Sequence, residues 1–101
     1  LPPGAVDLLP PLKALVPPAE VFDKCVYSPW TEPGLHERLR ARGVDTLVIS
    51  GVETDVCVAG AVLAAVDLGY RVVVPTDAIC SSSDETHDAL LTLYRRRYGQ
   101  Q

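Results

Sequence analysis

The stretch that most constrains the fold is residues 46–68, TLVISGVETDVCVAGAVLAAVDL. Residues 46–49 form a short, mostly β-branched run bounded by Gly51, which predicts a strand buried on both faces, as parallel strands in α/β proteins are. Residues 58–68 are rich in alanine and repeat apolar side chains at helical spacing. Between them, Thr54 or Asp55 is expected to cap the helix by accepting bonds from its free N–H groups. A buried strand therefore leads through a tight turn into an apolar helix.

Cys57 is the residue of this turn whose side chain is best suited to act as a nucleophile. It falls in the first turn of the predicted helix, where unpaired backbone donors and the positive end of the helix dipole favour thiolate over thiol. The thiolate is the nucleophilic form. Alternatively, Cys57 lies between Val56 and Val58 as a small buried hydrophobe, since free cysteines are among the most buried residue types. Its position alone leaves both interpretations open.

The chain before this stretch begins with a proline-rich segment. Six of the nine prolines lie in residues 1–18, which we expect to form an irregular segment on the protein surface. Residues 21–27 alternate as a strand does, with Lys24 inside it, and residues 28–34 follow as a loop that contains Trp30. Residues 35–42 predict a short amphipathic helix that Gly43 ends.

The chain after this stretch predicts a second strand followed by a second helix. Residues 71–75 predict a second buried strand, and residues 84–97 predict a final helix that follows a serine-rich capping loop, residues 81–83. The order from residue 46 onward is β-α-β-α, which implies parallel strands joined by right-handed crossovers. We therefore expect one α/β domain over residues 1–101, a three-layer α/β/α sandwich with a mostly parallel, doubly wound sheet.

Composition restricts the class of partner and the compartment. The formal net charge is −4, and the basic residues are scattered apart from Arg95, Arg96 and Arg97, so the sequence does not predict a nucleic-acid-binding surface. The three cysteines, Cys25, Cys57 and Cys80, are an odd number without a C-x-x-C pair, which favours a reducing cytoplasm over a disulfide framework. The apolar runs are too short to predict a membrane span or a secretory leader.

Three segments carry a resemblance to a known family. Residues 51–58, GVETDVCV, look like the nucleophile turn of the isochorismatase-like cysteine hydrolases, the superfamily of nicotinamidases, N-carbamoylsarcosine amidases and isochorismatases. Residues 69–72 (GYRV) and 76–78 (TDA) follow them at the distance along the sequence that the family leads us to expect. Residues 24–30, KCVYSPW, are similar to the family's strand-borne lysine followed by a serine and an aromatic residue. The resemblance covers residues 21–98.

The resemblance implies a site and a reaction. Cys57 would be the nucleophile, Lys24 would stabilise its thiolate, and a cis peptide bond between Val52 and Glu53 would aim the N–H groups of Glu53 and Cys57 at one point as an oxyanion hole. The reaction would cleave a C–N bond in a small amide or ureido compound through a thioester, without a cofactor. Trp30 would be a wall of the substrate pocket, or equally part of the core.

The resemblance also implies parts that this sequence does not contain. The family's general-base aspartate ends a strand that precedes anything present here, and neither Asp7 nor Asp23 is assigned that role. The same missing part holds the metal site of some nicotinamidases, so His36 and His87 are expected to be surface residues and no metal is expected. We therefore expect an incomplete domain, which is either the visible part of a longer protein or a truncated product that pairs its exposed strand edges with another chain. A homo-oligomer is expected. The alternative is a catalytically inactive or truncated domain with an assembly role.

Overall fold

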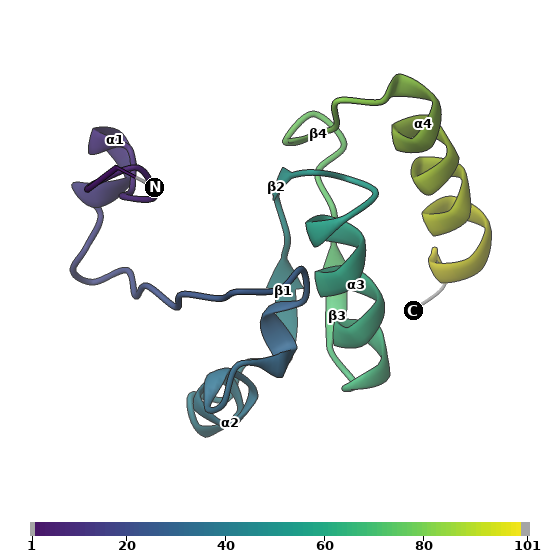
Figure 1. Cartoon of the computed structure of the whole chain (residues 1–101). Helices are drawn as coiled ribbons and strands as arrows, with labels where there is room; N and C mark the ends of the chain where they lie inside the picture. Colours follow the sequence, from purple (N-terminus) through teal and green to yellow (C-terminus); the bar gives the residue numbers. More distant parts are fainter. Residues whose placement is uncertain (1, 100–101) are drawn as a thin grey trace.

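The computed structural model describes residues 2–99, and the two ends of the predicted domain, residues 1 and 100–101, lie outside the described part. Figure 1 shows the helices and strands in sequence colours. In chain order they are α1 (Pro10–Lys13), the 3-10 turn η1 (Pro29–Thr31), α2 (Leu35–Ala41), β1 (Thr46–Val48), β2 (Gly51–Val52), α3 (Cys57–Asp67), β3 (Arg71–Val73), β4 (Ile79–Cys80), α4 (Asp84–Leu93) and the π-helical η2 (Tyr94–Tyr98).

The strands pair in parallel, which confirms the predicted α/β class. β1 pairs with β3, with Leu47 opposite Val72, and β2 pairs with β4, with Val52 opposite Cys80. In Figure 1, β2 lies beyond the end of β1 and β4 beyond the end of β3. The segment that follows β2 therefore leaves the sheet at the carboxyl end of its strands, where open parallel sheets bind ligands.

The core lies between one face of the strands and the helices α3 and η2. Its buried side chains are Val58 and Val62 of α3, Ile79 of β4 and Tyr94 of η2. On the opposite face of the sheet, Val48 is 67% exposed and Val73 is 42% exposed. The expectation that residues 46–49 are buried on both faces is therefore wrong, because no described helix covers the second face.

The strand predicted for residues 21–27 does not form. These residues are exposed and belong to no strand in the described structure. An extended segment becomes a strand only when a neighbouring strand accepts and donates its ladder hydrogen bonds. Within residues 2–99, no strand forms ladder hydrogen bonds with residues 21–27, so their alternating pattern does not produce a strand.

The elements with local boundary signals form close to where they are predicted. α2 ends at Ala41, and Gly43 follows with a positive φ of 73°, as a residue after a helix end commonly has. Ser83 caps α4 by accepting a hydrogen bond from the N–H of Thr86 at 3.3 Å. The last predicted helix continues past Leu93 as η2, with a change to π-type bonding.

The lead-in of the chain stands apart from the α/β part. In Figure 1, α1 lies away from the sheet and is joined to it by a long extended segment, and residues 2–27 are exposed. The lead-in is tied to α2 by Glu20, whose carboxylate pairs with Arg38 and, at 3.0 Å, with Arg42. Exposed pairs of this kind contribute little to stability, because water screens the two charges.

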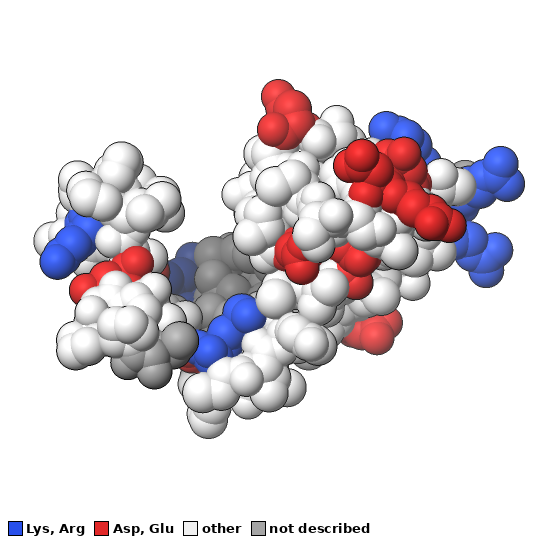
Figure 2. Space-filling model, turned by 45° about the horizontal axis from the view of Figure 1, so that its top comes forward, with Lys and Arg blue, Asp and Glu red and all other residues white. Residues whose placement is uncertain are grey.

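The surface carries both charges. On the face seen in Figure 2, Lys and Arg side chains stand in separate groups with uncharged surface or Asp and Glu between them. None of the helices within residues 2–99 has both the length and the apolar character that a membrane span requires.

Candidate active site

The turn between β2 and α3 places Cys57 at the start of a helix. Cys57 is the first residue of α3, and its thiol is free and half-buried. The Val52–Glu53 peptide bond is cis, at the position where the resemblance implies one. The sequence therefore correctly predicts the backbone of the turn: a strand, a cis peptide bond and a cysteine that opens the helix.

Some backbone donors of this turn are paired within residues 2–99 and others are not. The N–H of Thr54 donates to the carbonyl of Cys80 at 3.0 Å, and the N–H groups of Val56 and Val58 both donate to the carbonyl of Glu53. The hydrogen bonds of residues 2–99 include none from the N–H of Glu53 or of Cys57. These two N–H groups are thus available to an oxygen atom of a bound molecule.

The predicted helix cap is wrong. The residue that precedes α3 is Val56, and no side chain caps the helix. Asp55 instead accepts hydrogen bonds from two hydroxyls: Ser81 Oγ at 2.6 Å on one carboxylate oxygen and Thr86 Oγ1 at 2.7 Å on the other. These bonds, chiefly the one from Ser81, hold the pKa of the Asp55 carboxyl below its ordinary value.

Thr54 is the most buried polar residue of the turn. Its side chain has no exposed surface, and its hydroxyl lies 2.7 Å from Nδ1 of His87 on α4. The hydroxyl of Tyr94 donates to the Thr54 carbonyl at 3.4 Å. His87 on α4 is therefore only partly at the surface, and the hydroxyl of Thr54 provides it with a polar partner inside the fold.

Glu53 also joins the turn to the segment before α4. Its carboxylate accepts a hydrogen bond from the N–H of Ser82 at 2.7 Å. Bonds from the Ser82 side chain and backbone lower the pKa of the Glu53 carboxyl. Both acidic side chains of the turn therefore accept hydrogen bonds from residues 81–86, which lead into α4 and form its first turn.

Acid should release the Asp55 contact, and Asp55→Asn tests this. Because the pKa of Asp55 is lowered in the folded state, the contribution of its charge to stability is present above the unfolded pKa of about 3.9 and is lost as pH falls through the folded value. We expect the Tm difference between wild type and Asp55→Asn to be constant near neutral pH and to shrink in acid. Asp23→Asn, in the exposed lead-in, is the control; a pH-independent difference for Asp55→Asn would contradict this expectation.

Lys24 is not joined to Cys57 in this structure. It lies in the exposed segment before η1, and its ammonium group donates to the carbonyl of Val26 at 3.0 Å. No hydrogen bond within residues 2–99 connects Lys24 with Cys57. The position of Lys24 follows from the missing strand pairing of residues 21–27.

Trp30 packs against the middle of α3. Its indole N–H donates to the carbonyl of Ala61 at 2.9 Å, and its ring stacks on Tyr70 with centroids 5.3 Å apart. His36 closes this group, with Nδ1 2.7 Å from the Tyr70 hydroxyl. This geometry supports the core-packing interpretation of Trp30, and it shows that His36, partly exposed on α2, belongs to an aromatic cluster.

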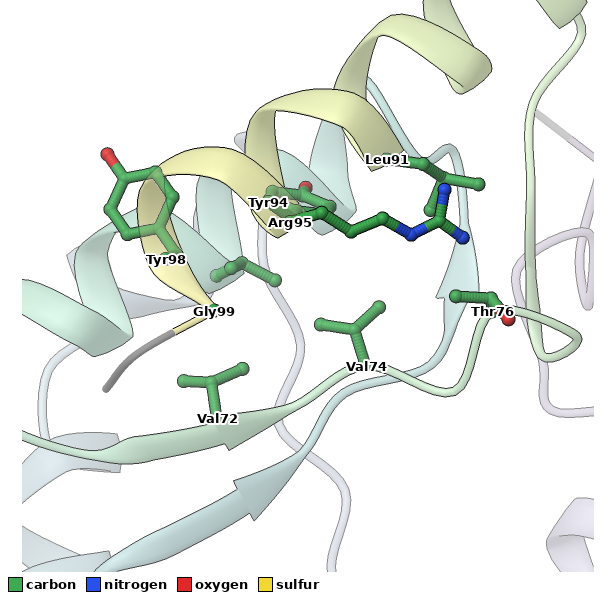
Figure 3. A pocket seen from close by; sticks show the side chains of 9 residues that line it. Val72, Val74, Thr76, Leu91, Tyr94, Arg95, Tyr98 and Gly99 are labelled. Atoms are coloured by element: carbon green, nitrogen blue, oxygen red, sulfur yellow. The ribbon is translucent and has the colours of Figure 1, made fainter.

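The apolar cleft shown in Figure 3 lies elsewhere. It has a volume of about 180 Å³. Its lining includes Val72 of β3 and Val74, which follows that strand, and Leu91, Tyr94 and Tyr98 from α4 and η2. None of its lining residues belongs to the turn 51–57. Among residues 2–99, no three His, Cys, Asp or Glu side chains gather as metal ligands would.

Comparison with known proteins identifies the family. The model of the isochorismatase domain matches residues 2–101. The chain belongs to the isochorismatase family. Relatives of this isochorismatase-family chain include Nicotinamidase 3 of Arabidopsis thaliana, 34% identical over 73% of this chain and 37% of that protein. A second protein of that plant bears the name "Probable inactive nicotinamidase" and is 40% identical over 65% of this chain and 34% of its own length.

Solved structures show the same fold. The pyrazinamidase/nicotinamidase of Streptococcus mutans matches with a TM-score of 0.73 and 40% identity over 77% of this chain and 43% of that chain. Strands and helices of this chain thus correspond to part of the isochorismatase fold. The chain spans 33% and 37% of the length of two curated relatives.

Sequence reasoning does not identify four residues that contact the turn: Ser81, Ser82, Thr86 and His87. Residues 81–83 are three consecutive serines, and their hydroxyls signal a cap for α4. The same hydroxyl chemistry also suits a carboxylate acceptor. Only the fold shows that Asp55, 26 residues from Ser81, is that acceptor.

Proposed function

We propose that this chain carries the nucleophile of a cysteine hydrolase that cleaves a C–N bond in a small amide or ureido compound. The observation that carries the proposal is the turn itself, where Cys57 opens α3 beside the N–H groups of Glu53 and Cys57 that have no acceptor. A nucleophile next to unpaired backbone donors is the arrangement that acyl transfer needs.

In the proposed reaction, the Cys57 thiolate attacks the substrate's carbonyl carbon and forms a C–S bond. The carbonyl oxygen becomes an oxyanion that accepts bonds from the two N–H groups of Glu53 and Cys57. The C–N bond then breaks, and the amine leaves with the proton that the Cys57 thiol lost on ionising, which the proton acceptor returns to the nitrogen. Water hydrolyses the resulting thioester, which releases a carboxylic acid and restores the thiol.

Two further roles belong to this proposal. Lys24 stabilises the thiolate once residues 21–27 lie along the sheet as a strand, since an ammonium group near a thiol favours its ionised form. The proton acceptor lies outside the turn, because the carboxylates of Glu53 and Asp55 are already bonded to Ser82, Ser81 and Thr86. The names of the relatives support a small amide, such as nicotinamide, as substrate.

Selective alkylation tests the nucleophile. Cys57 is half-buried, whereas Cys25 and Cys80 are exposed, so access alone would make Cys57 the slowest of the three to react. If its thiolate is stabilised, iodoacetamide at neutral pH should modify Cys57 about tenfold faster than the other two. Mass spectrometry of the three cysteine peptides over time measures the rates. Equal rates, or a slow Cys57, would contradict the proposal.

A second candidate function is a catalytically inactive domain of this fold that assembles with another copy of itself. Its supporting observations are the exposed sheet face with Val48 and Val73, and the relative whose name includes "inactive". An uncovered apolar face and unpaired strand edges favour association. A dimer by size-exclusion light scattering, together with no ammonia release from nicotinamide, would favour this candidate over the hydrolase.

A further inference from the structure

A network of side-chain contacts fastens the Cys57 turn to the start of α4. Three consecutive residues of the turn take part. The Glu53 carboxylate accepts a hydrogen bond from the Ser82 N–H, and the Thr54 hydroxyl is hydrogen-bonded to Nδ1 of His87. The Asp55 carboxylate accepts bonds from two hydroxyls. The partners are 26 to 33 residues further along the chain. None of these contacts involves Cys57 itself, so they leave the thiol free.

Asp55 makes the most complete of these connections. Each of its carboxylate oxygens accepts one hydroxyl, from Ser81 at 2.6 Å and from Thr86 at 2.7 Å. The two partners are themselves joined through Ser83: its N–H donates to Ser81 Oγ at 3.1 Å, and its hydroxyl accepts from the Thr86 N–H at 3.3 Å. Asp55 is therefore bonded to the cap of α4, which is a fixed structural element.

The place of Asp55 in the turn gives this contact its consequence. Asp55 lies between Glu53 and Cys57, whose N–H groups donate to no acceptor within residues 2–99. No side chain caps α3, so the bond that α3 makes to the turn is a backbone bond, from the N–H of Val58 to the carbonyl of Glu53. Bonds to ionised carboxylates are about twice as strong as neutral ones, so the Asp55 contact is well suited to hold the turn.

We propose that Asp55 is a positioning residue, which holds the N–H groups of Glu53 and Cys57 in register by fastening the turn to Ser81 and Thr86. The inference rests on the proposed function, for which these two N–H groups bind the oxyanion. Donors that bind a transition state must be held in place before reaction, and a shift of about 1 Å can reduce the rate up to about 100-fold. Loss of the contact therefore lowers kcat more than it raises KM.

The test compares Thr86→Val with Thr86→Ser in the full chain. Valine has the shape of threonine without the hydroxyl, whereas serine keeps the hydroxyl that donates to Asp55. With nicotinamide as substrate, Thr86→Val should lower kcat about tenfold and leave KM within about twofold. Thr86→Ser should restore most of kcat. A Thr86→Val protein with a lower Tm but wild-type kcat would overturn the proposal, because that result describes a purely structural contact.

Hydrogen exchange separates this inference from the proposed function. In Thr86→Val, amides of residues 53–57 should exchange faster than in wild type, while amides of the buried part of α3 around Val62 should keep their rates. If wild type hydrolyses no amide, the proposed function fails, and the exchange measurement alone decides whether Asp55 positions the turn. Unchanged or uniformly faster exchange would overturn the positioning role.

Discussion

Replacing Cys57 with alanine should abolish amide hydrolysis. The thiolate makes the covalent bond in the proposed reaction, and the two N–H groups of the turn cannot replace it. We expect kcat for ammonia release from nicotinamide to fall by about 10³-fold or more, as for other enzymes that lose their nucleophile. Initial rates at saturating substrate, measured on variants with matched Tm, determine the size of the loss.

Cys80→Ala is the matched control for this experiment. Cys80 is exposed and lies in β4, and its carbonyl, which the substitution keeps, accepts the hydrogen bond from Thr54. The control should retain activity within about twofold, since its thiol takes no part in the reaction. Hydrolysis that survives in Cys57→Ala would show that another group attacks the substrate, and it would remove the basis of the mechanism.

The sequence predicts the helix boundaries well because their signals are local. Helical spacing after Cys57, the glycine after α2 and the serine before α4 each act within a few residues. The cis bond at Val52–Glu53 was implied by a family resemblance and not by propensity, since a non-proline residue leaves no such signal in its own sequence. The sequence and the family resemblance together therefore predict the backbone of the candidate site.

The parts that were missed depend on long-range pairing. Residues 21–27 have the composition of a strand, but a strand exists only with a partner, and sequence alternation does not show which partner is present. Burial of Val48 likewise depends on what covers the sheet, and that face is open. Asp55 has the chemistry of a helix cap, yet two hydroxyls brought close by the fold offer it better contacts than the N–H groups of α3.

The same distinction between covered and open faces predicts a large difference in stability between two identical substitutions. Val62 is 2% exposed and packs in the core with Val58, Ile79 and Tyr94, whereas Val48 on the open face is 67% exposed. Val62→Ala removes two buried methyl groups and leaves a cavity, so it should lower the free energy of unfolding by about 2 kcal/mol. Val48→Ala should cost below about 1 kcal/mol.

Urea unfolding followed by tryptophan fluorescence measures this difference. Trp30 is the single tryptophan of the chain, and its indole is bonded to Ala61 of α3, one residue from Val62. Its emission therefore reports whether α3 remains packed. A shift of the urea midpoint for Val62→Ala with an unchanged m-value would locate the loss in the native core. Equal midpoints for the two variants would mean that the face around Val48 is covered as well as the core is, which would favour self-association through that face.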